Sequence, residues 1–207
     1  MEFQDVVRKR KMVRSFEARA IAPDVVERIL RNARRAPSAG HSQGWSFLVF
    51  EGPDTKGFWD VIWSDDDRNR FGYPALFNAP LVIVCVSERE VYLSRYAEPD
   101  KGWTDRDEKR WPVPFWDVDT AMAAMLILLT AVNEGLGALF FGVRRHAELK
   151  AAYGVPERAT VVGAIAIGHP AADRPSPSLR RGRRPESQVI HRGGWHAVSA
   201  RAADSPR

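Results

Sequence analysis

The sequence lacks most features that mark disulfide, metal or nucleotide sites. Its 207 residues include one cysteine, Cys85, which lies in the apolar run LVIVCV, so an intrachain disulfide and a CxxC site are both excluded. We interpret Cys85 as a small buried hydrophobe. The five histidines form no HxH or HExxH motif and no cluster with the cysteine, so we expect no metal site. P-loop and GxSxG motifs are also absent from the sequence.

Long hydrophobic runs are missing too. The longest, 121–132, is shorter than the ~20 residues that cross a bilayer. The N-terminus, MEFQDVVRKRKMV, carries charges where a secretory signal peptide needs an apolar core. We therefore expect a cytoplasmic protein. The glycine-rich stretch 135–142 does not match a dinucleotide fingerprint, because its third glycine comes late and the stretch precedes an apolar strand instead of following one.

Charge is distributed unevenly along the chain. The length, the 44% hydrophobic content and the 28% charged content are those of one globular domain. The net charge is +5, with a pI near 9.6. Residues 1–35 carry net +5, residues 36–173 net −6, and residues 174–195 net +5. Nucleic-acid binding is disfavoured because the basic segments contain few interleaved aromatic residues. The pattern instead suggests an anion held by two chain ends that meet in space.

Hydrophobic periodicity predicts a mixture of helices and strands, and therefore an α+β or α/β class. The predicted helices cover Glu2–Lys11, Pro23–Ala36, Asp117–Glu134 and His146–Tyr153. The predicted strands cover Ser46–Glu51, Pro80–Val86, Ala138–Val143 and Thr160–Ile167, with a further extended piece near Gln188–His191.

Two of these regions carry further expectations. The helix over Asp117–Glu134 has apolar side chains on more than one face, so we expect it to be buried nearly all round and shared with a second subunit. Residues 87–116 are polar, charged and interrupted by proline and glycine, which indicates a partly helical excursion and a candidate lid. Its aromatic side chains either cover a substrate or pack in the ordinary way; they are Trp103, Trp111, Phe115 and Trp116.

Four short motifs occur one after another along the chain. They are RKMVRSF at 10–16, RRAPSAGHSQGW at 34–45, GLGALFFG at 135–142 and RGRRPE at 181–186. Each alone is weak, but together they resemble the nitroreductase superfamily of FMN-dependent oxidoreductases. That family begins with R-R-S-x-R-x-F, continues with A-P-S/T-x-x-N-x-Q-P-W and a G-L-G strand, and closes with R-x-R/K-P.

The resemblance implies a fold, an assembly and an activity. The implied fold is α+β, with a central, mostly antiparallel sheet sandwiched by helices in a single domain over residues 1–195, and a flexible tail over 196–207. The implied assembly is an intertwined homodimer with FMN at the subunit interface. The implied activity is a ping-pong transfer of hydride from NAD(P)H through flavin N5 to a nitroaromatic, quinone or enone. No side chain need act as a general base, so we expect no catalytic residue.

Individual positions match the family's flavin contacts. The resemblance assigns the phosphate and ribityl chain to basic residues at both chain ends, with a methionine alongside: Arg10, Lys11, Met12, Arg14, Arg181 and Arg183. Arginine forks suit a dianionic phosphate because they bind it bidentately. A loop donated by the other subunit would pass along the isoalloxazine ring: Pro37, Ser38, Ala39, Gly40 and Ser42. Phe141 and Gly142 would lie beside flavin N5 and O4.

The chain also departs from the family. Met12 stands in place of a serine, His41 in place of an asparagine and Gly44 in place of a proline. The Asn and Lys that contact the flavin pyrimidine in better-known bacterial members are not recognisable around 71–77. Residues 138–141 contain no serine or threonine, and a hydroxyl there marks the dehalogenase branch, so we disfavour that activity. The alternatives left open are an FMN-dependent dehydrogenase or oxidase that tailors a small metabolite or peptide, and a relative that uses a deazaflavin.

Overall fold

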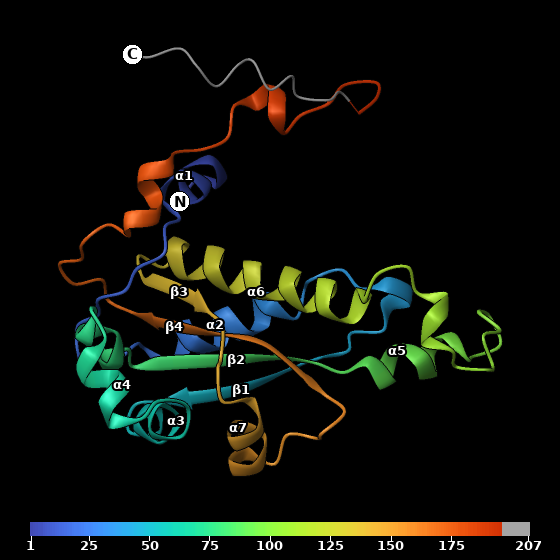
Figure 1. The fold of residues 1–207 in the computed structure, drawn as a ribbon, viewed down its shortest axis with the longest axis horizontal. Helices are drawn as coiled ribbons and strands as arrows, with labels where there is room; N and C mark the ends of the chain where they lie inside the picture. Colours follow the sequence, from blue (N-terminus) through green and yellow to red (C-terminus); the bar gives the residue numbers. More distant parts are fainter. Residues whose placement is uncertain (196–207) are drawn as a thin grey trace. The chain divides into compact units, whose positions relative to one another are not determined.

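The computed structural model describes residues 1–195, and its contacts divide the chain into two units, of which the second begins at Arg174. The tail expected over 196–207 lies outside the described residues, and the single domain over 1–195 stays a prediction. The first unit, residues 1–173, contains the sheet and its helices (Figure 1). Its helices and strands are α1 (Phe3–Lys9), α2 (Pro23–Ala33), β1 (Trp45–Glu51), α3 (Asp54–Ile62), α4 (Asp65–Arg70), β2 (Leu81–Ser87), α5 (Arg89–Tyr96), α6 (Phe115–Asn133), β3 (Gly137–Phe141), α7 (His146–Tyr153) and β4 (Thr160–Gly168).

The four strands form one antiparallel sheet in the order β1-β2-β4-β3. Ile83 at the centre of β2 lies opposite Val49 of β1 and Ile165 of β4. Every residue of β2 is buried, which accounts for its unbroken apolar sequence. The predicted α+β fold with a central antiparallel sheet is therefore confirmed.

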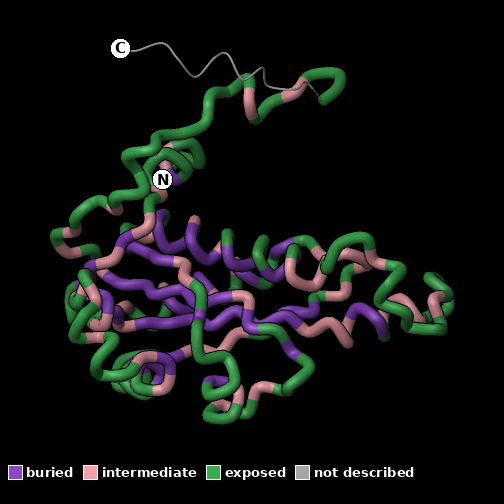
Figure 2. Tube along the Cα trace, in the orientation of Figure 1, coloured by how far each residue is buried: buried purple, intermediate pink, exposed green. Residues whose placement is uncertain are grey.

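Helices cover both faces of this sheet (Figure 1). Successive side chains of a strand point to opposite faces. Ile83 and Ile165 accordingly pack in one apolar cluster with α2 and α6, whereas Val84 and Ala164 pack in another with α3 and Leu149 of α7. Figure 2 shows the buried positions concentrated along the strands and the sheet-facing side of α6.

Within one chain, helix α6 is buried on its sheet-facing side only, so its expected burial all round depends on a second subunit and stays a prediction. Ala123, Ile127 and Ala131 are fully buried, but Met122 and Met125 on the opposite face are 38% and 46% exposed. By length and composition α6 could cross a membrane, and core helices packed on a sheet pass the same test. One side of this helix, which includes Val118, Met122 and Met125, is apolar surface that the chain itself does not cover.

Several predicted boundaries moved, and two α-helices of the described residues were not predicted. The second helix ends at Ala33 and not at Ala36, because Pro37 disfavours helical geometry at the residue before it. The extended piece near Gln188–His191 was wrong, since a 3-10 turn covers Glu186–Gln188. The unpredicted helices are α3 and α4, whereas α5 lies in the excursion that was predicted to be partly helical.

Candidate functional site

The first basic motif lies against β3. After α1 ends, Met12 forms a parallel bridge with Ala138, and the Val13 N–H donates to the Ala138 carbonyl at 3.0 Å. Gly137 allows this approach, because a Cβ there would lie 3.0 Å from the side chain of Val13. The motifs at 10–16 and 135–142 are thus brought side by side.

A cavity of about 320 Å³ lies at this junction. It is lined by Arg14 from the first motif and by Phe141 and Gly142 from the end of β3. Around them stand aromatic and charged side chains from α3, α4 and the segment that follows β3: Trp63, Asp67, Phe71, Arg144 and Arg145. We call this space the β3 cavity. Of the predicted flavin residues, it unites Arg14, Phe141 and Gly142.

Arg14 is fixed at the edge of the β3 cavity from several sides. Its backbone N–H donates to Asp173 at 2.8 Å, and its guanidinium donates to the Met12 carbonyl at 3.4 Å and lies 5.7 Å from the centre of the Tyr73 ring. Arg10 is half-buried and Lys11 is exposed, and neither lines this cavity.

Trp59 supports Phe141 from behind. The two rings stack at 5.5 Å with an interplanar angle of 20°, and Trp59 is 1% exposed. This residue was missed in the sequence because α3 was not predicted. Its spacing with Phe58 and Ile62 could have indicated a buried helical face.

The loop predicted to face the isoalloxazine ring is strained and tightly held. Gly40, His41 and Gln43 all have positive φ angles, of 61°, 56° and 55°, which are uncommon for residues other than glycine. The Gln43 N–H donates to the Ser38 hydroxyl at 2.9 Å, and the Ser42 hydroxyl donates to the Ala39 carbonyl at 2.7 Å. Such strain persists only where surrounding contacts enforce it.

Asp119 of α6 anchors this loop. Its carboxylate is 1% exposed and accepts hydrogen bonds from the Ala39 N–H and from the Tyr92 hydroxyl, both at 2.8 Å. Burial and the neighbouring Asp119 carboxylate raise the pKa of Tyr92, so its phenol stays protonated and continues to donate. Arg95 adds a bond from its Nε to the Gly40 carbonyl at 3.0 Å.

Tyr92 also explains the glycine at position 44. A Cβ on Gly44 would lie 2.5 Å from the Tyr92 ring and 2.9 Å from the backbone oxygen of Glu88. A proline in this place would meet the same obstruction. The buried Tyr92 of α5 therefore leaves no room for the family's proline, and this explains the glycine at position 44.

The candidate lid is an aromatic cluster. Trp111 contacts Trp103, Phe115 and Trp116 at centroid distances of 5.5 to 5.9 Å, and Tyr96 at 4.5 Å. Ion pairs join Arg95 to Asp100, Arg110 to Asp105 and Arg106 to Glu90 around it. The four predicted substrate residues are thus brought together, but they do not line the β3 cavity. Their role toward a substrate stays a prediction.

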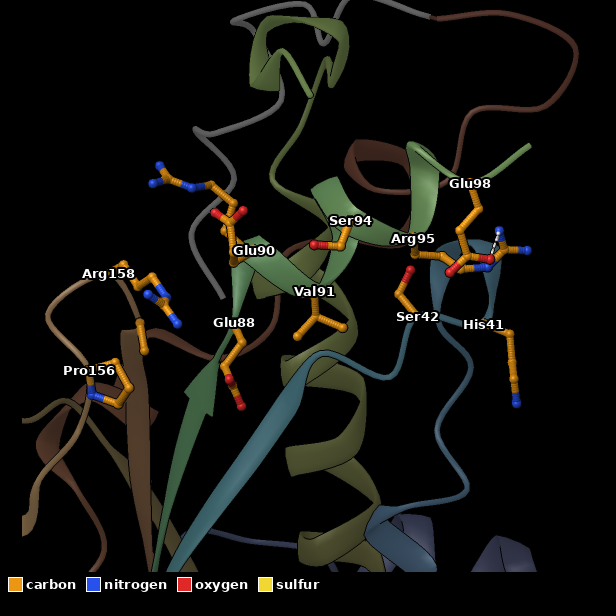
Figure 3. A pocket seen from close by; sticks show the side chains of 12 residues that line it. His41, Ser42, Glu88, Glu90, Val91, Ser94, Arg95, Glu98, Pro156 and Arg158 are labelled. Atoms are coloured by element: carbon orange, nitrogen blue, oxygen red, sulfur yellow. Dashed lines mark hydrogen bonds and ion pairs between the residues drawn. The ribbon is translucent and has the colours of Figure 1, made fainter. Parts of the chain in front are cut away.

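Ser42 lines a second cavity, of about 420 Å³, between the loop, α5 and the segment before β4. In Figure 3, His41 and Ser42 lie on one side of it, Pro156 and Arg158 on the other, and Val91 and Ser94 of α5 between them. The loop therefore lines a different cavity from the β3 cavity.

The second unit carries the closing basic motif. Arg181 ends a 3-10 turn, Pro177–Arg181, and Gly182 follows with a φ of 65°. Arg181 and Arg183 are both exposed. Their contact with the flavin phosphate stays a prediction.

Comparison with known proteins agrees with this architecture. The model of the nitroreductase family matches residues 7–169. A protein of Archaeoglobus fulgidus, provisionally named NADH dehydrogenase/NAD(P)H nitroreductase, is 27% identical over 78% of this chain and 81% of its own. The iodotyrosine deiodinase of Thermotoga neapolitana is 24% identical over 91% of this chain and 95% of its own. A provisionally named nitroreductase from Desulfovibrio desulfuricans, solved with FMN, superposes with a TM-score of 0.67 at 23% identity, covering 95% of this chain and 99% of that one.

Proposed function

Because the chain belongs to the nitroreductase family, we propose that it is an FMN-dependent oxidoreductase that takes electrons from NAD(P)H and delivers them to an electron-poor acceptor. The acceptor class is nitroaromatics, quinones or enones, and donor and acceptor use the same site in turn. The observation that carries this proposal is the β3 cavity, which joins two of the family's motifs in one place.

The residues around the β3 cavity suit FMN chemically. The cofactor has a dianionic phosphate and a flat, largely apolar ring, and the cavity offers the guanidinium of Arg14 beside the aromatic walls of Trp63 and Phe71. Gly142 has open space where a Cβ would stand, so its backbone is accessible to a bound ring. When bound, FMN supplies the hydride and electron transfer.

The protein residues would bind FMN, orient it and exclude water from the site. Arg10, Lys11 and Arg14 would hold the phosphate end together with Arg181 and Arg183. The backbone of Phe141 and Gly142 would lie along the reactive edge of the ring, with Trp59 stacked behind Phe141 to keep that backbone in place. No acid–base pair is required of the side chains.

We further propose that the active form is a homodimer. The loop over Pro37, Ser38, Ala39, Gly40 and Ser42 is held beside α5, away from the β3 cavity of its own chain. A flavin that touches both features would need the loop of a second copy. The exposed apolar side chains of α6 are suited to such an interface.

Reductive dehalogenation is not proposed, although several relatives are named for deiodination. β3 presents Ala138, Leu139, Phe140 and Phe141 toward its end, none of which carries a hydroxyl. We expect no turnover of 3-iodotyrosine by the reduced protein. Release of iodide at a rate comparable to nitro reduction would contradict this.

The proposed function is tested by the flavin itself. The purified protein should show FMN absorbance, lose it on addition of NADPH or NADH under argon, and regain it with a nitroaromatic or quinone. Faster reoxidation by oxygen than by either acceptor would favour the oxidase alternative, and a differently placed absorbance would indicate a deazaflavin. A colourless protein that fails to bind added FMN would overturn the proposal.

The phosphate site has a separate test. The double variant Arg10→Ala/Arg183→Ala should lose most FMN retention, while Arg31→Ala, an exposed arginine on α2, should retain FMN as the wild type does. Equal retention by both variants would show that the phosphate is held elsewhere.

A further inference from the structure

Two arginines that line the β3 cavity, Arg144 and Arg145, have no part in the proposed contacts with FMN. Three arginines line the cavity, against one carboxylate, that of Asp67. Asp67 accepts a hydrogen bond from the Ser64 hydroxyl at 2.8 Å and forms no ion pair with any of the three arginines. Like charges that share a concave site raise the local potential and attract an anion.

Arg144 is the arginine whose donors are free. Arg14 contacts Met12 and Tyr73 and is assigned to the cofactor phosphate, and Arg145 pairs with Glu148 at 2.9 Å. Arg144 makes no hydrogen bond or ion pair with any residue of the part of the chain that the structure describes, 1–195. A guanidinium can offer five N–H donors in a planar fork, which matches a carboxylate bidentately.

The position of Arg144 places it near the reactive edge of the proposed flavin. It follows Gly142 by two residues, so the two Cα atoms lie within about 7 Å of each other. The opposite end of the proposed cofactor, its phosphate, is assigned to the segment that contains Arg14. An anion beside Arg144 would therefore belong to the molecule stacked at the ring, and the aromatic walls, Trp63 and Phe71, suit a flat one.

We propose that Arg144 binds the anionic group of a flat aromatic acceptor, so that carboxylated nitroaromatics or quinones are preferred over neutral ones at this site. The proposal rests on the proposed function and assigns its substrate class. It makes Arg144 a specificity-determining residue.

The test compares two probes of nearly equal shape, 4-nitrobenzoate and the neutral 4-nitrobenzamide. Binding to the flavin-loaded, oxidised protein is measured by calorimetry, and kcat/KM is measured with NADPH in excess. The wild type should prefer the benzoate. Arg144→Gln should weaken benzoate binding and lower its kcat/KM by about tenfold, the effect of losing a charge-assisted hydrogen bond, and leave the benzamide nearly unchanged. Arg144→Lys should recover part of the loss, and Arg31→Gln should behave as the wild type.

Three results would overturn the proposal. Equal losses of binding and kcat/KM for both probes would mean that Arg144 shapes the cavity but does not recognise the charge of the acceptor. A raised FMN dissociation constant in Arg144→Gln would assign the arginine to the cofactor phosphate, and a change confined to flavin reduction by NADPH would assign it to the dinucleotide. FMN loading is measured first on the wild type, and its failure would reject the proposed function together with this inference. Normal loading without discrimination would reject only this inference.

Discussion

Asp119 is a buried carboxylate whose two hydrogen bonds link three parts of the molecule. It joins α6 to the loop at Ala39 and to α5 at Tyr92. Removing a buried acceptor costs more than the net value of its bonds, because each donor left behind is desolvated without a partner. The order of the loop over 37–42 thus depends on one side chain outside every motif.

Replacing Asp119 should therefore be severe. Asp119→Ala leaves the Ala39 N–H and the Tyr92 hydroxyl unpaired, and we expect it to lower the free energy of unfolding by about 2–4 kcal/mol. Tyr92→Phe removes one of the two bonds and should cost less. Urea denaturation measures both, with Asp24→Ala, an exposed carboxylate on α2, as a control that stays near the wild type. An Asp119→Ala protein as stable as that control would contradict this account.

Two glycines should respond to alanine in opposite directions. A methyl group at Gly44 meets the Tyr92 ring at 2.5 Å, so Gly44→Ala should destabilise the fold by about 1–3 kcal/mol through overpacking. Gly57 sits within α3, where a methyl group would meet only the Tyr153 hydroxyl at 3.5 Å, so Gly57→Ala should stabilise the helix by up to about 1 kcal/mol. Thermal melts of the two variants distinguish them. A loss of stability at both positions, or at neither, would show that space around the Cβ is not the deciding factor.

Sequence reasoning identified Gly44 as a departure but could not explain it. The cause is contact with a tyrosine 48 positions along the chain, which no local pattern encodes. In contrast, Arg14, Phe141 and Gly142 were predicted by their motifs and do meet at one cavity. Local motifs therefore predict which residues line the cavity, whereas the side chains that pack against those motifs come from elements distant in sequence and are not predicted.

At the scale of elements, the prediction of helices depended on length and on clear periodicity. α6 and β2 were predicted because their apolar patterns are long or continuous. α4 was missed because it has no buried residue, and its helix is defined instead by the Ser64 cap and by acidic side chains in its first turn. α5 was predicted only as part of a partly helical excursion, without bounds, because its buried residues, Tyr92 and Leu93, lie in an otherwise charged segment.

The excursion after β2 should respond to acid. The guanidinium of Arg95 holds the pKa of Asp100 below its ordinary value of 3.8, and Arg110 does the same for Asp105. A carboxyl group whose pKa is lowered by folding stabilises the folded segment above its ordinary pKa, and that contribution is lost as the pH falls through the lowered value. We therefore expect the segment around Trp103 and Trp111 to loosen below about pH 3.8.

Tryptophan emission against pH measures this loosening. The double variant Asp100→Asn/Asp105→Asn should already be loosened at neutral pH and should lack the acid transition. Because these ion pairs are exposed, added salt should weaken them in the wild type. An unchanged acid transition in the double variant would locate the titrating groups elsewhere.

At the scale of the whole molecule, the positive charge is divided between the two units of the chain. The N-terminal basic segment lies along β3, where Arg14 reaches the β3 cavity. The second basic segment forms a separate unit from Arg174 onward. The total charge of +5 alone could not have separated a phosphate site from a nucleic-acid surface, because the distinction depends on which elements carry the charge.

The exposed face of α6 carries the last prediction. Met122 and Met125 present apolar side chains that one chain leaves 38% and 46% exposed, and α6 also holds the loop over 37–42 through Asp119. If this face joins two copies, the interface and the flavin site are coupled, because each site takes its loop from the partner. Met125→Asp places a charge at the contact, where an unpaired buried charge is strongly unfavourable.

Met125→Asp should therefore be monomeric and should lose FMN together with the dimer, while its circular dichroism remains that of a folded chain. Ala152→Asp, which places the same charge on an exposed position of α7 across the sheet, should remain dimeric and yellow. Light scattering after size exclusion and the flavin-to-protein absorbance ratio measure both properties on one sample. A folded Met125→Asp monomer that retains FMN with wild-type affinity would show that a single chain completes the site, and the loop over 37–42 would then have no place in it.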